Sequence, residues 1–184
     1  RTMKLAFLYA GQGAQHVGMG RDFYEQFPLF RDVFDAAPVD FDLKKLCFEG
    51  PEEQLSDTRY TQPCMVAFAA GVTGLLYQAG IHPAMAAGLS LGEYSALTAA
   101  GVFDPKTAIE LVAFRGKAMA EAVTGRPCGM AAVLHLEREK LQAACDAASA
   151  LGVAEIANYN CPGQLVIAGD AAAVEKAGEL AKEA

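Results

Sequence analysis

The sequence is poor in basic residues and lacks any apolar run of transmembrane length. Its 184 residues contain 15 Lys and Arg against 22 Asp and Glu, a formal net charge of −7, and no basic stripe of the kind that a nucleic-acid surface requires. No apolar run is long enough to cross a membrane, and no signal-peptide pattern opens the chain. We therefore expect neither a nucleic-acid partner nor a membrane partner, and a cytoplasmic location.

Paired cysteine motifs are also missing. The cysteines are odd in number and include no C-x-x-C pair, which favours free thiols in a reducing compartment over disulfides or a metal site. They are Cys47, Cys64, Cys128, Cys145 and Cys161.

Nucleotide-binding loops are the third absence. The glycine-rich stretch G-Q-G-A-Q at residues 11–15 has His16 where the third glycine of G-x-G-x-x-G would stand, and no G-K-[ST] follows a glycine loop anywhere. We therefore set a dinucleotide site aside.

What is present is an ordinary globular composition, with 53% apolar and 20% charged residues. Apolar, strand-like runs at 3–9 and 84–88 alternate with helical patterns at 63–78, 91–100 and 105–123. This alternation predicts a parallel sheet with helices packed on it.

A change in composition at residues 124–127 predicts a hinge, which divides the chain into 1–126 and 127–184. The second part reads strand, helix, strand, strand, helix, the order of a ferredoxin-like subdomain without its last strand. A sheet without that strand has an open edge. We therefore expect the chain to be truncated before the closing strand of this small subdomain.

One serine stands out in the first part. Residues 86–95 read A-A-G-L-S-L-G-E-Y-S, which places Ser90 at G-x-S-x-G spacing between a predicted strand and a predicted helix. In a hydrolase-like serine elbow the glycines permit a sharp turn, and the helix N-terminus offers free N–H groups to an oxyanion. The alternative is an ordinary tight turn in which the serine caps the helix, and the motif alone does not decide between the two. The loop at 11–15 would emerge at the same sheet edge and could supply further N–H donors, which favours the elbow.

Arg115 is the second unusual residue. It shares one helical stripe with Ala108, Val112 and Met119, and an arginine on an apolar stripe is costly without an anionic partner. A structural salt bridge or a side chain that reaches solvent would explain it. Beside a nucleophile, a fixed guanidinium would instead suit a substrate carboxylate, which it can bind bidentately.

Four motifs in order, G-Q-G-A-Q, G-L-S-L-G-E-Y-S-A-L, F-R-G-K-A-M and N-Y-N-C-P-G-Q-L-V-I-A-G, make the chain resemble the malonyl-CoA:acyl carrier protein transacylases of bacterial type II fatty acid synthesis. The resemblance runs from Met3 to the last residue. It implies that 1–126 is the N-terminal part of a large α/β acyltransferase domain, and that 127–184 is the small subdomain. It also implies an acyl carrier protein and malonyl-CoA or CoA as partners. Malonyl-CoA is then a substrate, and no cofactor is implied.

The resemblance further implies a ping-pong transfer through a serine ester. Ser90 would be the nucleophile, the backbone N–H groups of Gln12 and Leu91 would bind the oxyanion, and Arg115 would hold the free malonyl carboxylate. Pocket-lining positions of the family correspond here to Gln62, Met119 and Asn160.

The chain departs from the family in two ways. Leu89 stands where the family usually has a histidine before the serine, which we expect to tune the site. The general-base histidine of the family lies beyond residue 184, and the three histidines present, His16, His82 and His135, are expected to be structural or solvated.

Two other functions remain open from the sequence. A serine hydrolase or thioesterase would need an acid and a histidine after the nucleophile and would not need Arg115. An inactive fragment would bind CoA or a carrier protein without turnover.

Overall fold

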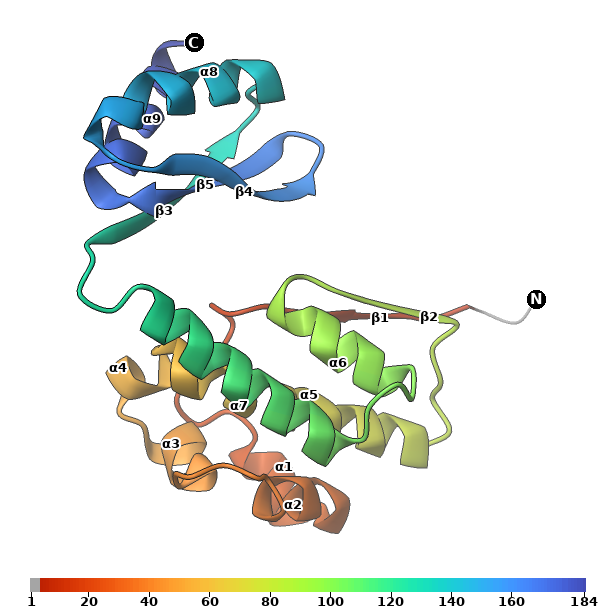
Figure 1. Ribbon diagram of the computed structural model, residues 1–184. Helices are drawn as coiled ribbons and strands as arrows, with labels where there is room; N and C mark the ends of the chain where they lie inside the picture. The colour runs from red at the N-terminus through yellow and green to blue at the C-terminus, as the bar shows by residue number, and fades with distance from the viewer. Residues whose placement is uncertain (1–3) are drawn as a thin grey trace. The chain divides into compact units, whose positions relative to one another are not determined.

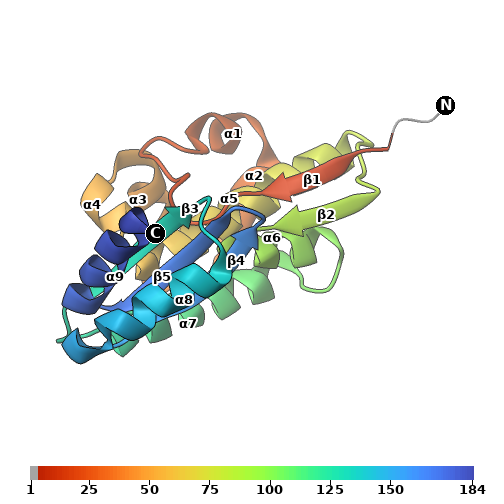
Figure 2. The same ribbon diagram turned by 90° about the horizontal axis from the view of Figure 1, so that it is seen from above.

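A computed structural model describes residues 4–184 of the chain (Figures 1 and 2). The residues divide into two compact units, the first ending at Ala122 and the second running from Val123 to Ala184. Each unit has a sheet and a hydrophobic core of its own, and each is described separately below.

The first unit joins a short parallel sheet to a set of helices (Figure 1). Its elements are β1 (Ala6–Tyr9), α1 (Arg21–Gln26), α2 (Pro28–Asp35), α3 (Leu43–Glu49), α4 (Glu52–Leu55), α5 (Thr58–Gln78), β2 (Met85–Gly88), α6 (Leu91–Ala99) and α7 (Pro105–Ala122).

Strands β1 and β2 pair in parallel, with Ala6 opposite Met85 and Tyr9 opposite Gly88. Parallel strands point their carboxyl ends toward the same sheet edge, so the segments that follow Tyr9 and Gly88 leave the sheet side by side. The parallel pairing predicted from the two apolar runs is therefore confirmed. Met3, the first residue of the expected strand, lies outside the described residues.

The core of the first unit lies among its helices rather than on the sheet. Phe30, Leu55 and Val112 are fully buried in it, and the rings of Phe23, Phe34 and Phe68 pack around Phe30. Helix α7 packs along α5, and α6 packs against both strands (Figure 1). These contacts fix α5, α6 and α7 around the carboxyl end of β2.

Helix α5 begins earlier than the sequence indicated. The expected start was Pro63, because proline is disfavoured inside a helix, yet the helix begins at Thr58 and contains Pro63. The carboxylate of Asp57 accepts a hydrogen bond from the Arg59 N–H at 2.9 Å and so caps the first turn. The cap adds a turn ahead of the proline, and this turn carries residues that face the candidate site.

The second unit is a three-stranded antiparallel sheet in the order β3-β5-β4 with two helices. Its core includes the fully buried residues Leu141, Ile167, Ala173 and Ala177, which come from the sheet and both helices. Its elements are β3 (Cys128–Leu134), α8 (Arg138–Ala148), a 3-10 turn η1 (Ser149–Leu151), β4 (Ala154–Cys161), β5 (Gln164–Asp170) and α9 (Ala171–Glu183).

An open strand edge is found in each unit. A groove of about 430 Å³ runs between β1 and α5, and it is lined by apolar side chains that include Leu8 and Phe68. A larger groove of about 940 Å³ runs along β3 and α9, where Met130 and Leu134 are exposed. The groove beside β1 includes no residue of the turn that follows β2. None of the helices between residues 4 and 184 combines the length and the apolar character needed to span a bilayer.

Candidate active site

Ser90 occupies a strained turn between β2 and α6. Its φ of 51° and ψ of −105° lie in a region that residues with a side chain rarely adopt. The flanking glycines are required by close packing: a Cβ on Gly88 would overlap with the backbone of Gly92, and a Cβ on Gly92 would overlap with the Tyr9 carbonyl. The turn is therefore as sharp as a serine elbow, and it leaves the Ser90 side chain exposed.

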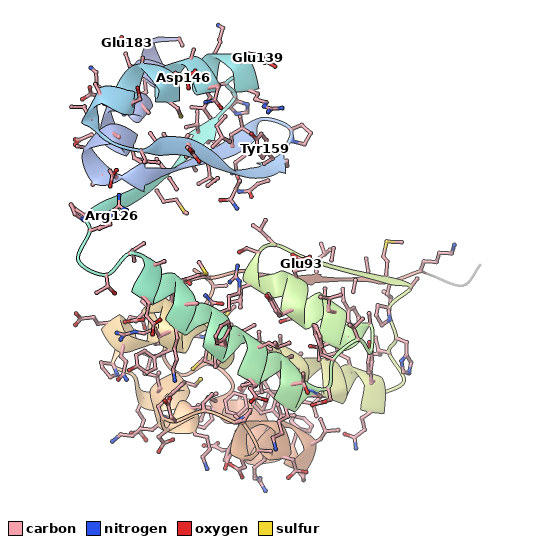
Figure 3. All side chains as sticks on the ribbon, in the orientation of Figure 1. Glu93, Arg126, Glu139, Asp146, Tyr159 and Glu183 are labelled. Atoms are coloured by element: carbon pink, nitrogen blue, oxygen red, sulfur yellow. The ribbon has the colours of Figure 1, made fainter. Side chains whose placement is uncertain are left out.

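The turn brings free backbone donors close to the serine. Leu91 is the first residue of α6, and its N–H donates to no described residue. The N–H of Gln12, in the loop after β1, is likewise without an acceptor within residues 4–184. The Leu89 N–H donates to the Tyr9 carbonyl at 3.3 Å, which ties the end of β1 to the serine turn. Glu93 lies on the first turn of α6, where a carboxylate favours the helix N-terminus (Figure 3).

Arg115 projects from α7 toward the serine. Its Nη2 donates to Ser90 Oγ at 3.0 Å, and its guanidinium lies over the Tyr94 ring, 5.7 Å from the ring centroid. No carboxylate of the described residues lies within ion-pair distance of it. The salt-bridge explanation of Arg115 is therefore wrong, and a half-buried cation beside the serine is left without an anionic partner.

Gln62 connects Arg115 to the helix behind it. Its Oε1 accepts from Arg115 Nη1 at 2.8 Å, while its Nε2 donates to Thr58 Oγ1 at 2.8 Å and contacts Met119 Sδ at 3.4 Å. The Thr58 hydroxyl in turn donates to Gln12 Oε1 at 2.9 Å. Gln62 is only 1% exposed, so these partners satisfy an amide that is otherwise cut off from water.

Six of the seven residues predicted for the site therefore lie in the first unit and within one hydrogen-bonded or directly adjoining set. The seventh, Asn160, lies on β4 of the second unit, where its Nδ2 donates to Gln164 Oε1 at 3.0 Å. The six are Gln12, Gln62, Ser90, Leu91, Arg115 and Met119.

No histidine hydrogen-bonds to Ser90 within the part of the chain that the structure describes. The His82 ring stacks on Tyr77, with centroids 4.8 Å apart, and the His135 N–H donates to the Gly163 carbonyl. His16 lies in the loop ahead of α1 and lines the groove beside β1. Among residues 4–184, the side chain that hydrogen-bonds to the serine hydroxyl is that of Arg115, which donates and cannot take up a proton.

Two arginines, Arg115 and Arg59, carry positive charge at or near the site. Beside Ser90, the Arg115 guanidinium is the one cation bonded to the described site residues. At the start of α5, the Arg59 guanidinium hydrogen-bonds to Asp57 and holds the pKa of that carboxyl below its usual range. Among the described residues, no group of three or more histidine, cysteine, aspartate or glutamate side chains could hold a metal ion.

Thr58 and Tyr94 belong to the site but were not predicted from the sequence. Thr58 precedes Gln62 by four residues, a spacing that places two side chains on one face of a helix. That signal was hidden because the helix was expected to begin at Pro63. Tyr94 precedes a serine within the quoted elbow motif, but nothing in its position indicated that its ring would lie under Arg115.

Comparison with known proteins decides the family. The sequence model of the acyl transferase domain matches residues 6–183. This chain belongs to the acyl transferase domain family. The resemblance to malonyl-CoA:acyl carrier protein transacylases, predicted from the four motifs, is confirmed as well.

Individual relatives agree with that assignment. The chain is 44% identical over 183 residues to the malonyl CoA-acyl carrier protein transacylase of Bacillus subtilis (strain 168), covering 98% of this chain and 58% of that protein. It matches the crystal structure of MCAT from Streptococcus pneumoniae with a TM-score of 0.86 and 49% identity, covering 98% and 59% of the two chains. A structure of a malonyl-transacylase in complex with its type II PKS acyl-carrier protein, in holo form, matches with a TM-score of 0.88 and 40% identity, covering 98% and 60%. The chain thus spans about three fifths of the length of these relatives.

Proposed function

We propose that this chain carries the nucleophile and the carboxylate-binding arginine of a malonyl-CoA:acyl carrier protein transacylase. The observation that carries the proposal is the hydrogen bond from Arg115 to Ser90 Oγ at 3.0 Å, made by a guanidinium that has no carboxylate partner among the described residues. A hydrolase of neutral esters has no use for such a cation beside its serine. A transferase of malonyl groups uses it to bind the free carboxylate.

The proposed reaction proceeds through a serine ester. The malonyl carboxylate binds the guanidinium of Arg115, which places the thioester carbonyl next to Ser90 Oγ. The hydroxyl attacks this carbonyl, its proton passes to a general base, and the N–H groups of Gln12 and Leu91 stabilise the negative oxygen. Collapse of the intermediate breaks the C–S bond and releases CoA as its thiol. The phosphopantetheine thiol of an acyl carrier protein then attacks the serine ester and regenerates the Ser90 hydroxyl.

The general base is assigned outside the residues described above. The family resemblance implies a histidine that follows the small subdomain, and the relatives that match this chain are longer than the part it covers. We therefore infer that the catalytic unit includes residues that correspond to the remaining two fifths of those relatives.

The finer organisation of the chain is part of the same proposal. We assign 1–126 to the large acyltransferase domain and 127–184 to a ferredoxin-like small subdomain, supported by the element order β3-α8-β4-β5-α9 and the strand order β3-β5-β4. Asn160 of the small subdomain is proposed to line the acyl pocket. The free thiols of the described residues support the proposed cytoplasmic location.

Intact-protein mass spectrometry tests the proposal. The natural polypeptide that carries this sequence, at its full length, is mixed with malonyl-CoA and quenched in acid. We expect a malonyl adduct that is absent in Ser90→Ala and retained in Ser149→Ala, a control at an exposed serine of the second unit. Transfer of the adduct to a holo acyl carrier protein, rather than to water, separates the transferase from a thioesterase. Failure of the wild-type protein to form the adduct would overturn the proposal and leave a binding function.

A further inference from the structure

A continuous series of hydrogen bonds connects Ser90 to the glycine-rich loop. Arg115 donates to Ser90 Oγ and to Gln62 Oε1, Gln62 Nε2 donates to Thr58 Oγ1, and the Thr58 hydroxyl donates to Gln12 Oε1. The residues come from the loop after β1, from α5, from the turn before α6 and from α7. Thr58 is the one member of this series that was not predicted from the sequence.

The direction of these hydrogen bonds is fixed by Arg115. A guanidinium only donates, so Gln62 must present its amide oxygen to Arg115 and therefore its NH₂ group to Thr58. The Thr58 hydroxyl must then accept from Gln62, and its single proton is left for Gln12 Oε1. The opposite amide orientation would place the NH₂ group of Gln62 against the guanidinium, with donor facing donor.

The position of Thr58 is fixed by the start of helix α5. Thr58 is the first residue of α5, directly after the capping Asp57, and it is half-buried. Gln62 is almost fully buried, so the loss of the Thr58 hydroxyl would leave its NH₂ group with the Met119 sulfur as its remaining partner. A thioether is a weak acceptor, and an amide NH₂ that has lost its oxygen acceptor gains stability by turning or shifting toward another one.

We propose that Thr58 is a positioning residue that holds the Gln62 amide oxygen on Arg115. Through its hydrogen bond to Gln12, it also fixes the position of the glycine-rich loop relative to the arginine. The proposal rests on the proposed malonyl transfer, because it concerns the same arginine. Its consequence is that the selectivity for an acyl group with a free carboxylate depends on a hydroxyl that touches neither the substrate nor the serine.

The test compares Thr58→Val with Thr58→Ser in the natural polypeptide at full length. Valine keeps the shape and removes the hydroxyl, whereas serine keeps the hydroxyl. The measured quantity is the rate constant of Ser90 acylation with malonyl-CoA and with acetyl-CoA, which lacks the carboxylate. We expect Thr58→Val to lower the malonyl-to-acetyl ratio by about tenfold, the size of effect typical of one lost hydrogen bond, and Thr58→Ser to stay within about twofold. Thr98→Val removes a helix hydroxyl whose one hydrogen bond within residues 4–184 goes to the Tyr94 carbonyl; it is the matched control and should leave the ratio unchanged.

A second measurement does not depend on activity. The side-chain amide protons of Gln62 should exchange with solvent about tenfold faster in Thr58→Val than in wild type or in Thr58→Ser, because their acceptor is gone.

The outcomes separate this inference from the proposed function. A wild-type protein that forms no malonyl-serine overturns the proposed function. A wild-type protein that forms it, together with a Thr58→Val variant that keeps both the acyl ratio and the slow amide exchange, overturns only the role of Thr58. Equal loss of the ratio in Thr58→Val and Thr58→Ser also overturns it, since the hydroxyl would then not be the group that matters.

Discussion

Arg115 is held from three sides: Gln62 and Ser90 accept its N–H groups, and Tyr94 lies under its plane. A guanidinium fixed in this way is already oriented before an anion arrives, so a carboxylate that binds it pays little for ordering the side chain. It also has N–H groups to spare, because a guanidinium carries five of them. The fork geometry, and not only the charge, is what the proposed malonyl selectivity requires.

The first prediction concerns Arg115→Lys. Lysine keeps the positive charge but replaces the planar fork by a single ammonium group, which cannot donate to Gln62, to Ser90 and to a carboxylate in the same geometry. We expect kcat/KM for malonyl-CoA to fall about 100-fold and that for acetyl-CoA to fall no more than about threefold, as steady-state kinetics would measure.

Arg31→Lys provides the control for this change. Arg31 donates to the backbone carbonyls of Tyr24 and Glu25 and hydrogen-bonds to none of the described site residues, so its replacement should leave kcat/KM for both substrates unchanged. A malonyl preference that survives in Arg115→Lys and in Arg115→Ala would show that the carboxylate is bound elsewhere.

The sequence predicted some of these residues for clear physical reasons and could not predict others. Ser90 and Arg115 were found because each breaks a local pattern: a serine between glycines at a strand end, and a charge on an apolar stripe. Thr58 breaks no pattern, since threonine is common at the start of a helix. Its importance depends on α5 lying beside both α7 and the loop after β1, and such long-range neighbours are not encoded in local spacing.

At the scale of elements, the serine turn depends on two backbones lying in contact. Gly92 lies against the end of β1, and Gly88 lies against the first turn of α6, with no room for a side chain at either position. The turn is thus supported by β1 as much as by its own residues. The glycine motif therefore reports how closely strand, turn and helix approach one another.

The second prediction is a stability difference between two glycine substitutions. Gly92→Ala should lower the free energy of unfolding by about 1–3 kcal/mol, because the new Cβ would overlap with the Tyr9 carbonyl and the helix would have to move. Gly178→Ala is the control: beyond the neighbouring residues and the backbone of α9 itself, no atom lies within 4 Å of the Cβ it would add, and alanine favours a helix, so it should stabilise by about 0.5–1 kcal/mol. Urea unfolding measures both, and a Gly92→Ala variant as stable as wild type would contradict the close approach.

Element boundaries were predicted less well than element types. The first strand of the second unit, β3, begins at Cys128 and ends at Leu134, and α5 begins five residues before its expected start. In β3 the pairing with β5 sets the boundaries: Cys128 lies opposite Asp170 and Leu134 opposite Gln164. Such boundaries depend on a partner strand, which an apolar run alone does not specify.

At the scale of the whole molecule, acidic side chains of both units are stabilised in their charged form. Hydrogen bonds from Lys44 to Asp35 and from Lys117 to Asp40 hold the pKa of each of these carboxyls below its usual value. The Val153 N–H, followed by Arg126, does the same for Asp170 of the second unit. Because Asp35 and Asp40 are exposed and Asp170 is partly exposed, each is expected to contribute little by itself, and the effect becomes measurable as a sum.

The third prediction is therefore acid sensitivity. These carboxyls have a lower pKa in the folded than in the unfolded chain, so they stabilise the fold while they are ionised. Their contribution is complete at a pH well above 3.8, the ordinary pKa of an aspartate. It is lost as the pH falls through the lower pKa of the folded state. Urea unfolding should give a free energy that is level from about pH 7 to pH 5 and falls steadily below about pH 4.

Removing two of these carboxylates tests whether they cause the loss of stability at low pH. The double variant Asp40→Asn, Asp170→Asn should be less stable than wild type at pH 7 and should show a shallower loss toward pH 3, because two of the contributing carboxyls are gone. An unchanged slope would assign the acid sensitivity to other groups.

In the part of the chain that the structure describes, one edge of β1 and one edge of β3 pair with no other strand, and this affects how these residues behave in a concentrated sample. Each edge presents free backbone donors and acceptors beside exposed apolar side chains, Leu8 on β1 and Met130 on β3. Such edges are templates for strand pairing between molecules. Residues 1–184 on their own should therefore self-associate as their concentration rises, and any longer polypeptide or partner that covers the two edges should act as a solubilising cap.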